Sequence, residues 1–307
     1  MPELPEVETV ARGLQREVAG RTIRTILLGK TDFIDNPAML EGGLPGRKIL
    51  AVERYGKFML LRLSASEGTG KNGDESALLV HLGMTGMLMP QAASEPQKKH
   101  THVVMLLDDG RELRYVDPRR FGRMAYLTGE ILIGELQRFG ADPLDASLAE
   151  FTKRIRERRA RIKALLLDQT VLRGVGNIYA DESLWKAKIH PAQLGARLKD
   201  EQVKKLYKAL QAILRKAIAL HGSSISDFLD ADGQPGEYQQ HHRVYGREGK
   251  ACSRCKAPVR RIIVAGRSSY YCPKCQKAPR GWKKPSRRRS SAIAVAPKLR
   301  KHQKSFE

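Results

Sequence analysis

The sequence is poor in acidic residues, cysteines and aromatic side chains, and it has no long apolar run. No stretch approaches the roughly 18 apolar residues of a membrane-crossing helix. The N-terminus opens with acidic residues and shows no basic segment followed by an apolar one, so we expect no signal peptide and a cytoplasmic protein. Acidic residues number 33 against 56 basic ones, which gives a net charge of +23. A chain of 307 residues has room for two domains with their own cores.

The positive charge is concentrated in two segments. Residues 153–163 contain seven basic residues and one acidic residue, and residues 278–307 contain ten and one. Neutralised phosphates supply most of the non-specific affinity for nucleic acids, so this clustering indicates a polyanionic partner. The alternative is a charged surface that only keeps the protein dissolved. From Pro279 onward the sequence lacks periodic apolar residues, and we expect a disordered tail.

Hydrophobic periodicity separates a strand-rich first part from a helical second part. Val7, Val10, Leu14 and Val18 recur at helical spacing, with Glu3 just before the helix that they predict. Short strand-like runs with turn signals between them are typical of a β-sandwich or barrel. Helical composition begins near residue 130, which suggests a domain boundary between 130 and 145. The expected strands are 22–28, 49–54, 58–63, 78–82, 103–107 and 112–116, and the expected helices include 130–140, 148–161 and 202–221.

All four cysteines lie near the C-terminus in a C-x2-C-x16-C-x2-C pattern. Four thiolates at this spacing are typical of a tetrahedral zinc site, which is structural because no ligand position stays open. Disulfides are the alternative, but a cytoplasmic chain makes them improbable. The segment between the pairs predicts a β-hairpin with Arg267 at its tip, either as an exposed arginine or as a phosphate contact. The candidate ligands are Cys252, Cys255, Cys272 and Cys275.

The first six residues carry a possible reaction centre. If the initiator methionine is removed, Pro2 presents a secondary amine that is partly uncharged near neutral pH. Such an amine can attack a carbonyl-like carbon and form an iminium. Glu3, if burial keeps it neutral, would then donate a proton. The same residues also suit an ordinary helix start, with Pro5 in the first turn, and taken alone this simpler interpretation is favoured.

Two further features allow a binding role and a plain structural role. The Gly174–Gly176 turn, followed by Asn177, suits either a phosphate contact or a connection between helices, and the connection is favoured. Met84, Arg119 and Phe121 lie on two turn-like segments. Methionine and phenylalanine are most often core residues. In a protein that acts on a base, however, apolar side chains enter the duplex when the nucleotide is extruded.

The chain resembles the bacterial formamidopyrimidine-DNA glycosylases, which remove oxidised purines such as 8-oxoguanine. The likeness is collinear over residues 1–276, and several of its motifs are long. The matching segments are MPELPEVETV (1–10), YGKFMLLRL (55–63), LLVHLGMTG (78–86), KHTHV (99–103), LRYVDPRRFGRM (113–124), LLLDQTVLRGVGNIYADESLWKAKIHP (165–191), DFLDADGQPG (227–236), VYGREGKAC (244–252) and GRSSYYCPKCQ (266–276).

The resemblance implies an α+β fold with four parts. An N-terminal catalytic β-sandwich opened by a helix would cover 1–130, and a helix–two-turn–helix DNA-binding domain would cover 131–243. A zinc finger with one structural Zn²⁺ would follow at 244–276, and a basic tail at 277–307. The implied partner is damaged double-stranded DNA. We expect a monomer without a nucleotide cofactor or a membrane partner.

The resemblance also implies roles for individual residues. Pro2 would form a Schiff base with C1′ of the damaged nucleotide, Glu3 would assist sugar opening, and Glu6 would support the site. Lys57 would take part in β-elimination and Arg267 in δ-elimination. The segment Gly222–Tyr238 would close over the flipped purine. The implied DNA contacts are His100, Arg119, Arg158, Lys163 and Asn177, with Met84, Arg119 and Phe121 filling the space that the purine leaves.

The sequence departs from the family pattern at Ser226, where arginine is common, and this leaves the finer lesion preference open. The Ser64–Ser76 loop is longer than expected, and the basic tail is an addition. One rival interpretation is an endonuclease VIII-like enzyme for oxidised pyrimidines, against which Leu4 argues because glycine is typical there. The other is a DNA-binding protein that has lost catalysis, which the presence of Pro2, Glu3, Glu6 and Lys57 disfavours.

Overall fold

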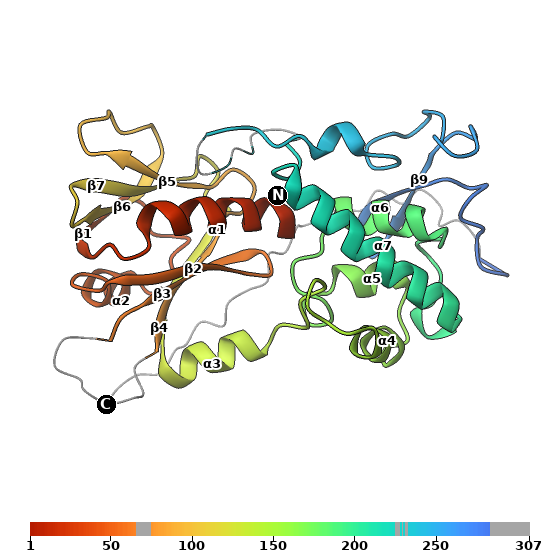
Figure 1. Ribbon diagram of the computed structural model, residues 1–307, viewed down its shortest axis with the longest axis horizontal. Helices are drawn as coiled ribbons and strands as arrows, with labels where there is room; N and C mark the ends of the chain where they lie inside the picture. The colour runs from red at the N-terminus through yellow and green to blue at the C-terminus, as the bar shows by residue number, and fades with distance from the viewer. Residues whose placement is uncertain (66–74, 225–227, 229, 231–232, 283–307) are drawn as a thin grey trace.

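The computed structural model describes residues 1–65, 75–224, 228, 230 and 233–282. The expected disordered tail beyond residue 282, the middle of the Ser64–Ser76 loop and the tip of the Gly222–Tyr238 segment lie outside these residues. The strands of the first half and the helices of the second half form two bodies, and the N-terminus lies where they meet (Figure 1). No helix among the described residues is long and apolar enough to cross a membrane.

The first half is a sandwich of two antiparallel four-stranded sheets, as the sequence predicts. Most expected strands appear within two residues of their predicted bounds. Strand β5 was not expected, because Pro90 interrupts it, and it lies at a sheet edge where proline costs no ladder hydrogen bond. One sheet has the order β1 (Ile23–Leu28), β6 (Thr101–Leu107), β7 (Arg111–Val116) and β5 (Met87–Ala92); the other has β2 (Ile49–Tyr55), β3 (Phe58–Leu63), β4 (Ser76–His81) and β8 (Arg123–Thr128).

Helix α1 (Leu4–Val18) lies along the sandwich and belongs to both halves. Its apolar face, which includes Val7, Val10 and Leu14, packs into the core of the sandwich. Its first residue, Leu4, is instead fully buried in the core of the helical half. The start of α1 is therefore inserted into the second half, close to α7, as Figure 1 shows. A short helix, α2 (Pro37–Gly43), was not expected and covers part of the sandwich.

The described residues of the second half form five α-helices. The first of them, α3, packs on strands β4 and β8 of the sandwich through Leu132. The basic helix α4 ends at Arg156, although helical composition continues to 161. Seven basic residues in eleven repel one another along a helix, so the early end is understandable. These helices are α3 (Gly129–Gln137), α4 (Leu148–Arg156), α5 (Ile162–Leu167), α6 (Asn177–Ala187) and α7 (Asp200–Ala219), with short 3-10 turns at Gly195–Arg197 and Tyr238–His241.

A small hairpin completes the described chain. Strands β9 (Arg260–Val264) and β10 (Arg267–Tyr271) pair around the expected turn, and Arg267 opens the second strand. Ile262, Val264 and Tyr271 pack with Ala192 of the helical half. Strand β10 also lies against α6, so the hairpin tip is held close to the centre of the molecule.

The two halves are joined by a buried ionic cluster. Arg54 at the end of β2 donates to Glu8 of α1 and to Asp142 of the helical half, both at 2.6 Å. Arg173 lies 3.5 Å from the same Asp142 carboxylate and covers the Tyr55 ring. One carboxylate thus receives a guanidinium from each half. Because removing one partner would leave a buried charge uncompensated, this cluster fixes how the halves meet.

Candidate active site and DNA-binding face

Glu3 is the side chain that most directly connects the two halves. It forms the N-cap of α1, as the sequence predicts, but its carboxylate points to another helix. The backbone amides of Ile178 and Tyr179, in the first turn of α6, donate to it at 3.0 and 3.4 Å. Helix N-termini attract negative charge. Glu3 is therefore buried as an acceptor at the junction.

The Gly174–Gly176 turn allows this close approach. A Cβ at Gly176 would lie 2.2 Å from the Glu3 side chain, and one at Gly174 would lie 2.9 Å from Leu4. The Leu4 amide donates to the Gly174 carbonyl at 3.0 Å. The turn links α5 to α6, as the favoured interpretation expected. Its close partners are α1 residues, so the glycines are explained without a phosphate.

Glu6 is the centre of a buried polar network. Its carboxylate accepts from the amides of Glu3 (2.8 Å) and Ser223 (2.7 Å) and from the hydroxyl of Tyr179. Ser223 Oγ in turn lies 3.1 Å from Nε2 of His242. Burial raises the pKa of Glu6 to about 7, assisted by the neighbouring Glu3 carboxylate. This network ties the start of α1 to the beginning of the Gly222–Tyr238 segment.

Lys57 lies beside these carboxylates, in the two-residue turn between β2 and β3. Gly56 precedes it with φ +68°, a backbone conformation that glycine adopts without strain and that two-residue hairpin turns require. Burial lowers the pKa of Lys57, and the charge of Arg267 lowers it further, while Glu3 and Glu6 act in the opposite direction. The turn therefore delivers a buried amine to the junction of the halves.

The N-terminal amine of the full chain, which is that of Met1, lies near Glu3, Glu6 and Lys57. Burial lowers its pKa, Glu3 and Glu6 raise it, and Lys57 and Arg119 lower it. All four side chains are thus within electrostatic reach of the chain end. Pro2 is buried, and its nitrogen is bonded to Met1 in the full sequence. The amine expected from the sequence exists only after Met1 is removed.

The structure gives Lys163 a different position from the phosphate contact that was expected. Its side chain is 0 % exposed, and Nζ donates to Asp181 Oδ1 at 2.6 Å and to the Ser268 carbonyl at 2.8 Å. The other Asp181 oxygen accepts from the amide of Tyr270 at 2.9 Å. The Lys163–Asp181 pair therefore holds the finger strand β10 against α5 and α6. Solvent does not reach the ammonium group in this arrangement.

Met84 and Phe121 are exposed, so their interpretation as core residues is wrong. They are 39 % and 50 % accessible, although both are large and apolar. The guanidinium of Arg119 covers the Phe121 ring at 4.5 Å. His100, with φ +70°, is exposed at the start of the neighbouring strand β6. Met84, Arg119 and Phe121 lie on two loops of the sandwich, and with His100 they form one patch with an apolar centre and a cationic side.

The last two expected DNA contacts lie in the helical half. Arg158 follows α4 and is half exposed, and its guanidinium donates to Asp168 (2.6 Å) and Thr170 (2.9 Å). Asn177 is the first residue of α6, and its buried Oδ1 has no partner among the described residues. Arg158 can therefore meet a phosphate on its exposed side. Both contacts with DNA stay predictions.

The four cysteines converge at the base of the finger hairpin. Their sulfur atoms all lie within 4.8 Å of one another. Tetrahedral zinc with Zn–S bonds of about 2.3 Å places sulfurs about 3.8 Å apart, so the cluster fits one ion. Trp185 Nε1–H points at Cys252 Sγ (3.4 Å), which suits a thiolate acceptor. Four protein ligands make this a structural zinc site, as the spacing predicts.

Sequence reasoning missed the buried residues that hold the site together. Tyr179, Asp181 and Glu182 lie close together on α6, inside the motif NIYADES, and each faces a different element. Glu182 accepts from the amides of Arg243, Val244 and Tyr245 at 2.8–3.0 Å. The available signal was two adjacent acidic residues flanked by apolar ones in Ile178–Leu184, since buried carboxylates need donors.

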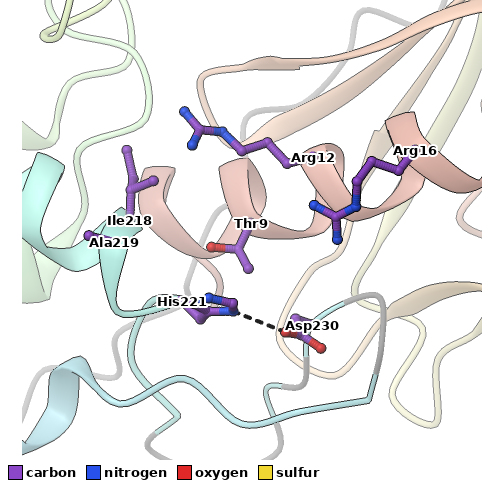
Figure 2. A pocket seen from close by; sticks show the side chains of 7 residues that line it. All are labelled: Thr9, Arg12, Arg16, Ile218, Ala219, His221 and Asp230. Atoms are coloured by element: carbon purple, nitrogen blue, oxygen red, sulfur yellow. Dashed lines mark hydrogen bonds and ion pairs between the residues drawn. The ribbon is translucent and has the colours of Figure 1, made fainter.

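A separate hollow of about 240 Å³ lies between α1 and the end of α7. Figure 2 shows Arg12 and Arg16 of α1 on one side and His221, which is 3.3 Å from Asp230, on the other. None of the site residues expected from the sequence lines this hollow. The hollow lies at the foot of the Gly222–Tyr238 segment, to which Asp230 belongs, and Glu3, Glu6 and Lys57 do not line it.

Comparison with known proteins agrees with this geometry. Three family models match in chain order: the formamidopyrimidine-DNA glycosylase N-terminal domain at residues 1–124, the H2TH domain of the same proteins at 139–229, and the zinc finger found in FPG and IleRS at 249–278. The formamidopyrimidine-DNA glycosylase of Herpetosiphon aurantiacus is 43 % identical over 281 residues, covering 90 % of this chain and all of that protein.

Solved structures extend the agreement to three dimensions. The MutM (Fpg) protein of Thermus thermophilus superposes with a TM-score of 0.77 at 41 % identity, covering 91 % of this chain and all of that one. A mutant of the Lactococcus lactis Fpg in complex with Fapy-dG-containing DNA gives 0.81 at 33 % identity, covering 90 % and 100 %. With three collinear domain matches and a relative aligned over its full length, the chain belongs to the formamidopyrimidine-DNA glycosylase family.

Proposed function

We propose that this protein is a bifunctional DNA glycosylase and abasic-site lyase that removes oxidised purines from duplex DNA. The observation that carries the proposal is the convergence of the N-terminal amine, Glu3, Glu6 and Lys57 where the two halves meet. The sequence separates Lys57 from the N-terminus, and the fold brings them together. The Fapy-dG complex of the Lactococcus relative supports an oxidised purine as substrate.

The proposed reaction uses the amine of Pro2 after removal of Met1. The nitrogen lone pair attacks C1′ of the damaged nucleotide, and the C1′–N bond to the base breaks with its electrons going to the base. The nitrogen loses its proton, the base takes one up, and the nitrogen lone pair is again available. Opening of the sugar ring breaks the bond from C1′ to the ring oxygen, which takes a proton with help from Glu3. The product is an iminium between Pro2 and C1′.

Strand cleavage follows from the iminium. It acidifies C2′, so a base removes a proton there and the 3′ phosphate leaves by β-elimination. A second elimination expels the 5′ phosphate, and hydrolysis then frees the amine. Lys57, a buried amine with a lowered pKa, is the proposed proton acceptor for the first elimination. Arg267, at the exposed finger tip and within electrostatic reach of Lys57, is proposed to assist the second elimination.

The remaining residues serve binding. We propose that the 1–130 domain carries the chemistry, and that the 131–243 and 244–276 parts grip the phosphates through Arg158, Asn177 and the basic segment. Lys163 would then act indirectly, by holding the finger in place. The zinc ion stabilises the finger and takes no part in the reaction steps above. A cytoplasmic location beside the chromosome follows from this role.

Borohydride trapping tests the proposal. One duplex carries 8-oxoguanine opposite cytosine and the other carries an oxidised pyrimidine, and the adduct is mapped by peptide mass. We expect an adduct on the purine duplex, attached to Pro2. The Pro2→Gly variant should lose most of the adduct, whereas Pro37→Gly, which changes another proline at a helix start, should keep it.

Each other outcome points to a specific alternative. Adduct formed mainly on the pyrimidine duplex would favour the endonuclease VIII-like interpretation. Binding to both duplexes without any adduct would leave a DNA-binding protein that has lost catalysis. An adduct that persists in Pro2→Gly at the normal rate would refute the assigned nucleophile.

A further inference from the structure

We propose that Asp117, with the hydroxyl of Tyr115, is a positioning residue that fixes the two loops carrying Met84, Arg119 and Phe121. Through these loops it would set how readily the protein opens a duplex. The inference rests on the proposed function, since it concerns extrusion of the damaged nucleotide. It adds two residues that neither touch the reacting atoms nor face solvent.

The Asp117 carboxylate is fully buried and is saturated with donors from both loops. Oδ1 accepts from Thr85 Oγ at 2.7 Å and from the Arg119 amide at 3.2 Å. Oδ2 accepts from the Gly122 amide at 2.9 Å and from Tyr115 Oη at 3.2 Å. A carboxylate offers about four acceptor positions, so none is left for water or DNA.

This carboxylate therefore joins the segments of the exposed patch. Thr85 follows Met84 on the first loop, and the two amides flank Phe121 on the second. The amide of Asp117 itself donates to the His100 carbonyl at 3.1 Å. Each of the four exposed residues of the patch therefore either forms a hydrogen bond with Asp117 or is the chain neighbour of a residue that does.

Tyr115 supports the arrangement from inside the sandwich. Its hydroxyl packs directly under the second loop, where a Cβ at Gly122 would lie only 1.8 Å from it. Burial raises the pKa of this hydroxyl, and the nearby Asp117 charge adds to the effect. The group therefore remains protonated and donates to Asp117 at every working pH.

His81 completes the support of the first loop. Its Nδ1 accepts from the Gly83 amide at 3.0 Å, and burial lowers its pKa to about 3, with Lys57, the chain end and Arg123 acting in the same direction. The neutral ring can therefore accept at every working pH. The Gly86 amide donates to the Leu82 carbonyl at 2.8 Å, which closes the other end of the loop. Met84 is the side chain that this rigid loop presents to solvent.

The two loops must be rigid because Met84 and Phe121 have to be in position before they enter the duplex. Separating stacked bases costs free energy at each step, and an inserted apolar side chain offsets this cost fully only if it is already in place. In a loosened loop, part of the binding energy would be offset by the ordering of the loop itself. The loss should appear in extrusion from a duplex and not in attack on a sugar that is already accessible.

The experiment compares duplex substrates, which require extrusion of the damaged nucleotide, with a substrate that requires no extrusion. Single-turnover adduct formation is measured on 8-oxoguanine in duplex DNA, opposite cytosine or adenine, and on an abasic site in single-stranded DNA. The variants are Asp117→Asn, Tyr115→Phe and Thr85→Val. Asp109→Asn is the matched carboxylate control, since Asp109 accepts from the amide two residues on, as Asp117 does. Tyr126→Phe is the hydroxyl control, since its buried hydroxyl has no partner within the described residues.

We expect Asp117→Asn to slow the duplex reaction on the order of tenfold, the size of one lost charged hydrogen bond. Tyr115→Phe and Thr85→Val should act in the same direction with smaller effects, and discrimination between the opposite bases should narrow. The single-strand reaction and both controls should match the wild type. If Asp117→Asn does not fold, the other two variants carry the test.

Two results would overturn the inference. One is an equal loss on duplex and single-stranded substrates, which would indicate general damage to the fold. The other is an unchanged duplex rate in folded Tyr115→Phe and Thr85→Val. A wild type that forms no adduct on any substrate would instead refute the proposed function, so the two failures are distinguishable.

Discussion

The regions around Lys57 and Lys163 both bury a lysine amine, but they surround it differently. Both side chains are buried, and burial lowers both pKa values. Lys163 donates to Asp181 and to a finger carbonyl, in the helical half. Lys57, on the sandwich, forms no hydrogen bond within the described part of the chain, and two carboxylates influence it from a distance.

This difference distinguishes a structural lysine from a reactive one. A buried ammonium with two close acceptors is held in place, and its proton is not available. A buried amine without such acceptors loses its hydration with only partial compensation from carboxylates that do not bond to it. It is shifted toward the neutral form, which suits proton transfer. The sequence presents both as lysines in a basic protein, and only their surroundings separate them.

The comparison is tested most strongly at Lys163. Lys163→Met leaves Asp181 buried without its partner, so we expect a loss of about 4 kcal/mol in the free energy of unfolding. Urea denaturation followed by circular dichroism measures it. Lys205→Met is the control, because Lys205 pairs with Glu201 on the surface of α7 and should change little. A Lys163 variant with full stability but weakened DNA binding would restore the phosphate-contact role.

The carboxylates beside Lys57 give a pH-dependent test. Glu6 has a pKa of about 7 in the folded protein against an ordinary 4.5. The folded state therefore holds a proton that the unfolded state releases, so this contribution is complete below pH 4.5 and is lost as pH rises through 7. The difference corresponds to about 3 kcal/mol.

Glu6→Gln removes that titration. Wild type and variant should differ in the slope of unfolding free energy between pH 4.5 and 7, with the wild type losing stability more steeply. Glu41→Gln, on the surface of the short helix α2, is the control and should follow the wild type. Identical slopes for wild type and Glu6→Gln would show that Glu6 is ionised throughout this range.

Local patterns in the sequence were sufficient for much of the fold. The helix after Glu3, the strand runs, the finger hairpin and the cysteine cluster all depend on short-range spacing, which the sequence displays directly. Strands β5 and β8 and helix α2 were missed. Pro90 in β5 argues against a strand unless the edge position is known, and α2 has only seven residues.

Contacts between distant segments could not be predicted in the same way. Nothing local shows that Leu4 belongs to the helical core, that Glu3 receives the amides of α6, or that Lys163 is buried under the finger. Residue type also gave a wrong prediction of burial: Met84 and Phe121 are of types that usually lie in the core, but here they lie on the surface. The alternative in which these side chains enter a duplex allowed for that exposure, and the resemblance to a family favoured it.

The smallest effect on stability is expected for substitution of Lys57. Two variants of this residue distinguish a role for its positive charge from a role in proton transfer. Lys57→Met should lower the rate of β-elimination about 100-fold, the usual contribution of a general base, while leaving the free energy of unfolding unchanged or raised because no buried charge remains. Lys57→Arg keeps the positive charge but cannot give up a proton at neutral pH. If Lys57 accepts the C2′ proton, arginine does not restore elimination, measured on a preformed abasic site by gel separation of the cleaved strand. If Lys57 only attracts phosphate, arginine restores the rate, and Lys57 then resembles an ordinary binding residue that happens to be buried.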